Sequence, residues 1–194
     1  MPNWCNTIYA VTGDKGEVRD LYNKMKSLSE RDTSLVENGF GKTWLGNLVT
    51  LLGGDWNKVY CRGDYSMLEI DPDDNCLHFT TVSAWSDLDE VIGFLQGKYP
   101  SLEFYFMAEE FGADYWVTND EGGKYFQDRY FFSPPDYLEA DYYTEKQLGI
   151  LLKDVSKFVG REIDTIEEAC KAIDEYNPKD VAGEWAEIRI CQIV

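Results

Sequence analysis

The first part of the chain carries two kinds of hydrophobic pattern that follow one another in a regular order. In some segments every second residue is apolar, as in a strand with one buried face, and in others apolar residues recur every three or four positions, as in an amphipathic helix. The segments are a strand at 5–11, a helix at 15–28, strands at 66–70 and 77–84, a helix at 87–98 and a strand at 102–108. The order βαββαβ predicts an α+β fold in which both helices pack on one face of a sheet.

Further segments extend this unit. Apolar residues at helical spacing over 43–53 predict a short inserted helix, and Gly53–Gly54 marks its end. Strands at 114–118 and 124–132 flank the run 119–123, which ends in two glycines and predicts a β-hairpin that extends the sheet. We therefore expect a ferredoxin-like split βαβ arrangement with an inserted helix and an extra hairpin.

The last part of the chain is predicted to hold two helices and a strand. Thr144 and Thr165 are followed by apolar stripes at helical spacing and are expected to cap the two helices, and 185–193 alternates like a strand. The sequence therefore divides into a ferredoxin-like domain at 1–137 and a helical extension with a final strand at 138–194. We expect both to pack on the same body.

Charge is distributed unevenly along the chain. Of 194 residues, 18 are basic and 36 acidic, so the formal net charge is −18, and the acidic middle segment, 64–143, holds 18 carboxylates and three basic residues. This charge argues against direct nucleic-acid binding, which needs Lys and Arg to replace the counterions of the phosphates. The acidic middle segment is either a solvated surface or a docking face for a basic partner. No apolar run is long enough to span a membrane and no leader is visible, so we expect a cytoplasmic protein.

The residues that could bind a metal do not form a recognisable motif. Five cysteines at wide spacings, with no Cys-x-x-Cys, are typical of ordinary thiols in a reducing compartment. Cys76 and His78 lie on one face of a predicted strand, but two ligands do not make a site. Asp71, Asp73 and Asn75 have the spacing of a calcium loop, but Cys76 stands where that loop needs glycine. We predict no metal and no cofactor.

Catalysis is not favoured by the sequence. His78 is the only histidine, and no serine stands in a nucleophile-elbow motif, so no nucleophile has an evident base. Pairs of carboxylates, Asp87 with Asp89 and Glu109 with Glu110, leave open an alternative function as a carboxylate-based, metal-dependent hydrolase, since oxygen ligands suit Mg²⁺ or Mn²⁺. We lean towards a protein without catalytic residues.

Aromatic residues are concentrated between 104 and 137, where there are twelve. Adjacent aromatic residues on a strand point to opposite faces, so both faces of this region need cover. They form either a core between two layers or an exposed aromatic platform.

Four short segments resemble the YubB ferredoxin-like family, whose members are encoded mainly on plasmids, phages and integrated elements. These segments are Met1–Asn6, Ser83–Ser86, Tyr99–Pro100 and Glu109–Glu110, and the resemblance extends over about 1–132. It implies a ferredoxin-like fold and a mobile-element setting, and it assigns no catalytic residue.

Together these patterns predict an accessory factor of a mobile element that binds another macromolecule through an acidic, aromatic-rich face. We expect a basic protein of the host or of the element as partner, with no nucleic acid and no membrane bound directly. A second alternative is a DNA-mimic protein that acts against host defence. The candidate partner-binding residues are Trp85, Asp87, Asp89, Glu109, Glu110, Tyr115 and Trp116.

Overall fold

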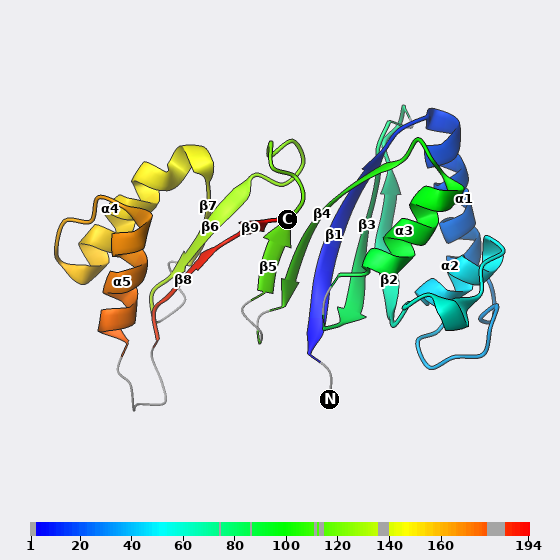
Figure 1. Ribbon diagram of the computed structural model, residues 1–194, viewed down its shortest axis with the longest axis horizontal. Helices are drawn as coiled ribbons and strands as arrows, with labels where there is room; N and C mark the ends of the chain where they lie inside the picture. Colours follow the sequence, from blue (N-terminus) through cyan, green and yellow to red (C-terminus); the bar gives the residue numbers. More distant parts are fainter. Residues whose placement is uncertain are drawn as a thin grey trace. The chain divides into compact units, whose positions relative to one another are not determined.

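A computed structural model describes most of the chain (Figure 1). The described residues are 3–73, 75–85, 87–110, 112, 115–135, 140–177 and 185–194. Over these residues the protein is of the α+β class, with five α-helices, a mixed six-stranded sheet of order β2-β3-β1-β4-β5-β9 and a three-stranded antiparallel sheet of order β7-β6-β8. It divides into two compact units, Met1–Glu121 with Val194, and Gly122–Ile193.

The first unit contains five strands in which every neighbouring pair is antiparallel. The strands are β1 (Trp4–Thr12), β2 (Gly63–Ile70), β3 (Leu77–Ala84), β4 (Glu103–Glu110) and β5 (Tyr115–Thr118). The helices are α1 (Lys15–Ser29), α2 (Leu45–Leu51) and α3 (Asp89–Lys98), with a 3-10 turn η1 (Trp56–Lys58) after α2. The alternation of apolar residues therefore predicted β1, β3 and β4 to within two residues at each end.

One hydrophobic core holds the helices of the first unit against the sheet. Leu21 and Met25 of α1 and Leu95 of α3 pack in the same cluster as Tyr9 of β1 and Phe79 of β3. Figure 1 shows α1, α2 and α3 along one side of this sheet. The expectation that both predicted helices cover the same face is confirmed. Burial of such side chains contributes about 1.5–3 kcal/mol each, so this face carries most of the stability of the unit.

The second unit has a smaller sheet covered by two helices. Its elements are β6 (Asp128–Ser133), β7 (Asp141–Thr144), η2 (Glu145–Gln147), α4 (Leu148–Val159), α5 (Ile166–Tyr176), β8 (Glu187–Ile190) and β9 (Gln192–Ile193). Tyr130 and Phe132 of β6 share a core with Leu151 of α4 and Ile173 of α5. The Thr144 capping box with Gln147 and the Thr165 cap are both present, as expected.

The predicted hairpin over 114–132 is wrong. β5 pairs with β4, whereas the strand that follows it, β6, pairs with β7 and β8. The reason lies at Asn119, whose side chain accepts from the backbone N–H of Phe106 and donates to the carbonyl of Phe104. These bonds extend the contact between the chain and β4, so the chain does not turn back along β5.

The two compact units divide at Glu121–Gly122, and β6 belongs to the second unit. The division into domains after 137 stays a prediction. The single strand predicted at 185–193 is two short strands, β8 and β9, with Cys191 between them. None of the helices in the described part of the chain is both long and apolar enough to cross a bilayer.

Candidate functional site

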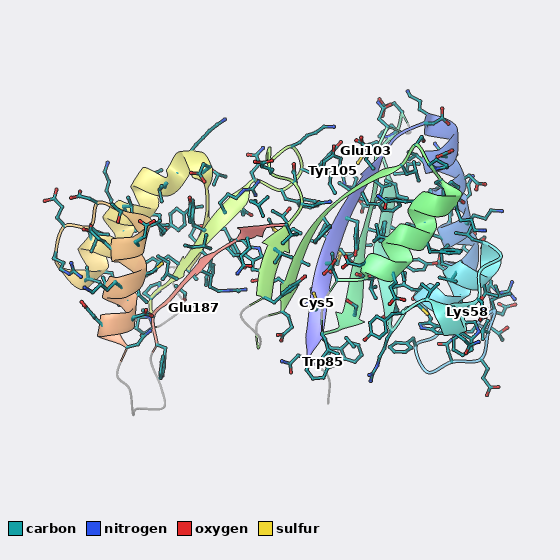
Figure 2. All side chains as sticks on the ribbon, in the orientation of Figure 1. Cys5, Lys58, Trp85, Glu103, Tyr105 and Glu187 are labelled. Atoms are coloured by element: carbon teal, nitrogen blue, oxygen red, sulfur yellow. The ribbon has the colours of Figure 1, made fainter. Side chains whose placement is uncertain are left out.

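Four strands of the first unit reach the same end of the sheet, which we call the sheet end. β1 and β5 begin there and β3 and β4 finish there, because these strands pair antiparallel. The register places Trp4 opposite Ala84, and Tyr115 opposite Glu110. Figure 2 shows Trp85 at this end, beside the start of β1. Segments that are up to 110 residues apart along the chain therefore meet at the sheet end.

Two aspartates and a tyrosine form a hydrogen-bonded group at the sheet end. The Tyr115 hydroxyl donates to Oδ1 of Asp87 at 2.6 Å, and the Asp87 carboxyl also hydrogen-bonds the carboxyl of Asp89. Burial raises the pKa of Asp87, and the neighbouring Asp89 raises it further, although the bond from Tyr115 opposes this. Two carboxyls in such contact favour sharing one proton.

Cys5 and Glu110 lie on the sheet close to this group. Cys5 is fully buried, and burial raises the pKa of its thiol, with smaller contributions from the charges of Asp87 and Glu110. Glu110 is only 4% exposed. Its Oε1 accepts from the N–H of Gly112 at 2.8 Å, but its Oε2 is buried and has no hydrogen-bond partner. We call Cys5, Asp87, Asp89, Glu110 and Tyr115 the acidic cluster.

Trp85 follows β3 directly and stands in an unusual backbone conformation. Its φ is +77°, in the left-handed region that bulky residues rarely occupy. The turn is fixed by its N–H, which donates to the carbonyl of Asn3 at 2.9 Å. The Trp85 side chain is 55% exposed. A strained residue that presents a large aromatic side chain to solvent is a feature typical of functional sites.

Four aromatic rings form a contiguous group beside Trp85, which we call the aromatic cluster. Trp4 contacts Phe40 edge-on, Phe40 stacks on Trp44, and Trp44 meets Trp56 edge-on with ring centroids 5.2 Å apart. The indole N–H of Trp44 donates to the carbonyl of Cys61 at 2.8 Å, which fixes the central ring. Trp4 and Trp56, at the two ends of the group, are exposed.

A pocket of about 500 Å³ opens on this aromatic cluster. Its walls are formed mainly by Phe40, Trp44, Trp56, Tyr60 and Glu90, with Lys58 and Arg62 also lining it. The backbone N–H of Tyr60 donates to a Glu90 carboxylate oxygen at 2.6 Å, and the Tyr60 hydroxyl donates to the carbonyl of Ala84. Because Ala84 precedes Trp85 in the chain, this bond ties the pocket wall to the strained turn.

All seven residues predicted from the sequence to bind a partner are described by the structure, and they differ in accessibility. Trp85 and Asp89 are exposed, which makes Trp85 a surface residue and not part of the core. Asp87, Glu109 and Tyr115 are half-buried. Glu110 and Trp116 are buried, and Trp116 is only 2% exposed, so neither can form direct contacts with a partner in this conformation.

The aromatic residues between 104 and 137 do not form an exposed platform. The ones that the structure describes are all buried or half-buried: Phe104, Tyr105, Phe106, Tyr115, Trp116, Tyr125, Phe126, Tyr130, Phe131 and Phe132. Phe111 and Tyr137 lie outside the described residues. The exposed aromatic side chains of the first unit are instead Trp4, Trp56, Tyr60 and Trp85.

Sequence reasoning did not single out the residues of the pocket. No periodic pattern links the aromatic residues of the pocket. Phe40 and Tyr60 lie in loops, Trp44 directly precedes α2, and Trp56 begins the 3-10 turn η1. Aromatic residues are no more than slightly enriched between 40 and 60, so composition gave no clear signal either. Their approach depends on Gly46, where a Cβ would collide with the Trp44 ring.

Among the described residues, one group of three potential metal ligands has its ligand atoms within 4.8 Å of one another. It consists of Asp71, Cys76 and His78, at the opposite end of β3 from the sheet end. The carboxylates of the acidic cluster do not form such a group within the described part of the chain.

Comparisons with protein-family models, with curated proteins and with solved structures give no match for this chain. The site is therefore interpreted from its own geometry.

Proposed function

We propose that this protein is a non-catalytic binding module that docks a basic segment of a partner protein at the sheet end. The observation that carries the proposal is Trp85, an exposed aromatic side chain on a strained turn. Tyr60 of the aromatic pocket is hydrogen-bonded to the carbonyl of Ala84, the residue before Trp85, and the carboxylates of Asp87 and Asp89 follow Trp85 in the chain.

The chemistry of the sheet end suits a partner that combines an apolar anchor with a basic side chain. Trp and Tyr carry much of the energy of protein interfaces because they bury large areas with few rotatable bonds. An Arg or Lys over the Trp85 ring gains a cation–π contact, and the charges of Asp87 and Asp89 attract it. Lys58, which also lines the pocket, already pairs with Asp55 at 3.6 Å.

The same residues argue against catalysis at this site. The Cys5 thiol is fully buried and its pKa is raised, so the thiolate needed for nucleophilic attack is disfavoured. His78, the sole histidine, pairs with Ala10 near the opposite end of β3, whereas the sheet end lies at Trp4 and Ala84. The Asp87 carboxyl is engaged by both Tyr115 and Asp89.

One observation favours a second candidate, the carboxylate-based, metal-dependent hydrolase. The buried Oε2 of Glu110 has no hydrogen-bond partner, and a divalent cation would satisfy it. This candidate requires Mg²⁺ or Mn²⁺ to raise the melting temperature of the protein, and Glu110→Gln to abolish the shift. No shift at millimolar metal eliminates it.

Two features support the finer fold and family assignments that we propose alongside this function. The order β2-β3-β1-β4, with α1 and α3 in one core, is that of a ferredoxin-like split βαβ unit. Three of the segments that resemble the YubB-like family, at 3–6, 83–85 and 109–110, meet at the sheet end. This convergence supports a role for the sheet end in the accessory function of a mobile element.

The test is a selection of random phage-displayed peptides on the immobilised full chain at 0.1 M and 1 M salt. We expect peptides that pair Arg or Lys with an aromatic residue, captured at low salt and lost as the Debye length falls from about 10 Å to about 3 Å. Trp85→Ala should weaken the selected peptides by about 30-fold or more, which corresponds to ~2 kcal/mol. Asp89→Asn should weaken them less.

The matched control is Tyr176→Ala, which removes an exposed aromatic side chain from the second unit. It should leave peptide affinity unchanged. Because Trp85 and Tyr176 are both exposed, both variants should keep the near-ultraviolet circular dichroism of a folded core. Selection of acidic peptides, or equal affinity for the Trp85→Ala and parent proteins, would falsify the proposal.

A further inference from the structure

The turn between β2 and β3 brings three chemically different ligands together, away from the sheet end. Asp71 follows β2, Cys76 precedes β3, and His78 is the second residue of β3. The Asp71 N–H donates to the carbonyl of Cys76 at 2.9 Å, which closes the turn. Because residues two apart on a strand share a face, Cys76 and His78 lie on the same face of the hairpin.

A β-bulge places Asp71 on that face as well. β2 pairs Ser66 with Thr80, and regular alternation would next place Leu68 opposite His78. Instead the register shifts by one residue, and Glu69 lies opposite His78. Met67 takes up the extra residue with φ +49°. The shift turns residues 69 and 71 towards the face of His78, which is how bulges redirect side chains near functional sites.

The distances within this group are close to those of a coordinated metal. The ligand atoms of Asp71, Cys76 and His78 all lie within 4.8 Å of one another, and Nε2 of His78 lies 3.8 Å from Oδ1 of Asp71. Tetrahedral zinc with ordinary bond lengths separates such ligand atoms by about 3.3–3.6 Å. Small side-chain rotations would therefore bring the three atoms to coordination distance.

We propose that Asp71, Cys76 and His78 bind Zn²⁺, with the fourth coordination position open to water. Thiolate and imidazole are ligands that select zinc and its neighbours in the first transition row over Mg²⁺ and Ca²⁺. Cys76 is only 5% exposed, whereas the side chains of Asp71 and His78 are 45% and 41% exposed, so solvent reaches the site from one side. This site does not depend on the function proposed for the sheet end.

Binding at this site displaces the proton of the Cys76 thiol, because only the thiolate coordinates zinc. The affinity for Zn²⁺ should therefore fall as the pH is lowered. A calcium loop built on Asp71, Asp73 and Asn75 would bind through oxygen alone and would not need Cys76 or His78.

The experiment is a titration of the reduced full-length chain with Co²⁺, a spectroscopic substitute for zinc. We expect a thiolate-to-cobalt charge-transfer band in the near ultraviolet and tetrahedral d–d bands in the visible, both displaced by stoichiometric Zn²⁺. Asp71→Asn and His78→Ala should each weaken cobalt binding by at least about tenfold. Cys76→Ser should abolish the charge-transfer band.

Two matched controls keep the test specific. Cys170→Ser removes a thiol from α5, and Asp73→Asn removes a carboxylate from the same turn, and neither should change the spectrum or the affinity. Because Asp71 and His78 are half-exposed, their variants should fold even where a change at buried Cys76 does not, and circular dichroism verifies this. Cobalt binding that survives His78→Ala and Asp71→Asn at parental affinity, or that is lost in Cys170→Ser, overturns the proposal. Equal thermal stabilisation by Ca²⁺ and Zn²⁺ overturns it as well.

Discussion

The two ends of strand β3 differ in how the chain enters or leaves the sheet and in the side chains that surround it. At the sheet end, Trp85 adopts a left-handed turn two residues before the half-buried Asp87, and the rings of the aromatic cluster are packed against one another. At the hairpin end, Met67 adopts a left-handed bulge, and half-exposed Asp71 and His78 face each other. Each end contains one strained residue that is not glycine. The sheet end presents aromatic side chains next to the carboxylates of Asp87 and Asp89. The hairpin end presents the three potential metal ligands Asp71, Cys76 and His78.

This difference indicates which ligand each end can accept. A preformed aromatic pocket gains affinity by burying a side chain of the partner, with little rearrangement. A group of metal ligands on a tight turn gains affinity by coordination bonds, which need movements of about 1 Å or less. Variants that change only the aromatic cluster should therefore leave metal binding at the hairpin end unchanged.

The largest effect is expected from Gly46→Ala in α2. A Cβ at Gly46 would overlap the Trp44 ring, which is held by its bond to the Cys61 carbonyl and by its neighbours Phe40 and Trp56. Overpacking of this kind costs about 1–3 kcal/mol of unfolding free energy. Urea unfolding should show the loss, together with weaker peptide binding at the sheet end. Cobalt binding at Asp71, Cys76 and His78 should be unchanged.

The control for that prediction is Gly93→Ala in α3, the same substitution with the opposite expected sign. A Cβ at Gly93 meets no atom within 4 Å, and its φ is not in the left-handed region. Alanine there should raise the unfolding free energy by about 0.5–1 kcal/mol, since glycine is the poorer helix former. Equal destabilisation by the two substitutions would show that the Trp44 contact is not the cause.

The next effect concerns the two strained residues. Glycine adopts positive φ at no steric cost, whereas other residues pay about 1–2 kcal/mol. At position 85, with φ +77°, and at position 67, with φ +49°, glycine should therefore give a more stable protein than alanine, by about 1 kcal/mol. Chemical denaturation of Trp85→Gly, Trp85→Ala, Met67→Gly and Met67→Ala measures both differences. Alanine variants as stable as the glycine variants would mean that the backbone relaxes out of the left-handed region.

The sequence predicted local periodic elements better than their tertiary arrangement. β1, β3 and β4 followed from alternation, and the caps at Thr144 and Thr165 followed from residue type. The hairpin predicted after β5 is wrong because Asn119 uses its side chain to continue the contact with β4. The pairing of this segment with β4 and not with β6 depends on the bond between Asn119 and Phe106, which are 13 residues apart in the chain.

The candidate sites also differ in how far the local sequence predicts them. Trp85, Asp87 and Asp89 could be chosen from the sequence because they lie where a strand passes into a helix. The aromatic pocket could not, because Phe40, Trp56 and Tyr60 come from irregular segments that only the fold brings together. The bulge coincides with two adjacent apolar residues, Met67 and Leu68, and this signal alone does not connect Asp71 with Cys76 and His78.

The smallest effect is expected from the protonation of Asp87. Its pKa in the folded state is raised, chiefly by burial, so the folded protein holds this proton more tightly than the unfolded chain does. The stabilisation from Asp87 is therefore fully present below the unfolded-state pKa, about 3.9, and is lost as the pH rises through the higher folded-state value. At neutral pH the buried charge is a net cost, which Asp87→Asn removes.

Asparagine at position 87 keeps an oxygen for the Tyr115 hydroxyl and gains an N–H for the Asp89 carboxylate, so the hydrogen bonds of the cluster are retained. Urea unfolding between pH 4 and 8 should give Asp87→Asn a flatter dependence on pH than the parent and a higher unfolding free energy at neutral pH. Asp55→Asn is the control of opposite sign. Hydrogen bonds from Asn57 lower the pKa of Asp55, so its contribution is present above the unfolded-state value and lost as the pH falls. If both variants shift the pH profile in the same direction, burial of the Asp87 carboxyl is not what sets the acid response of the sheet end.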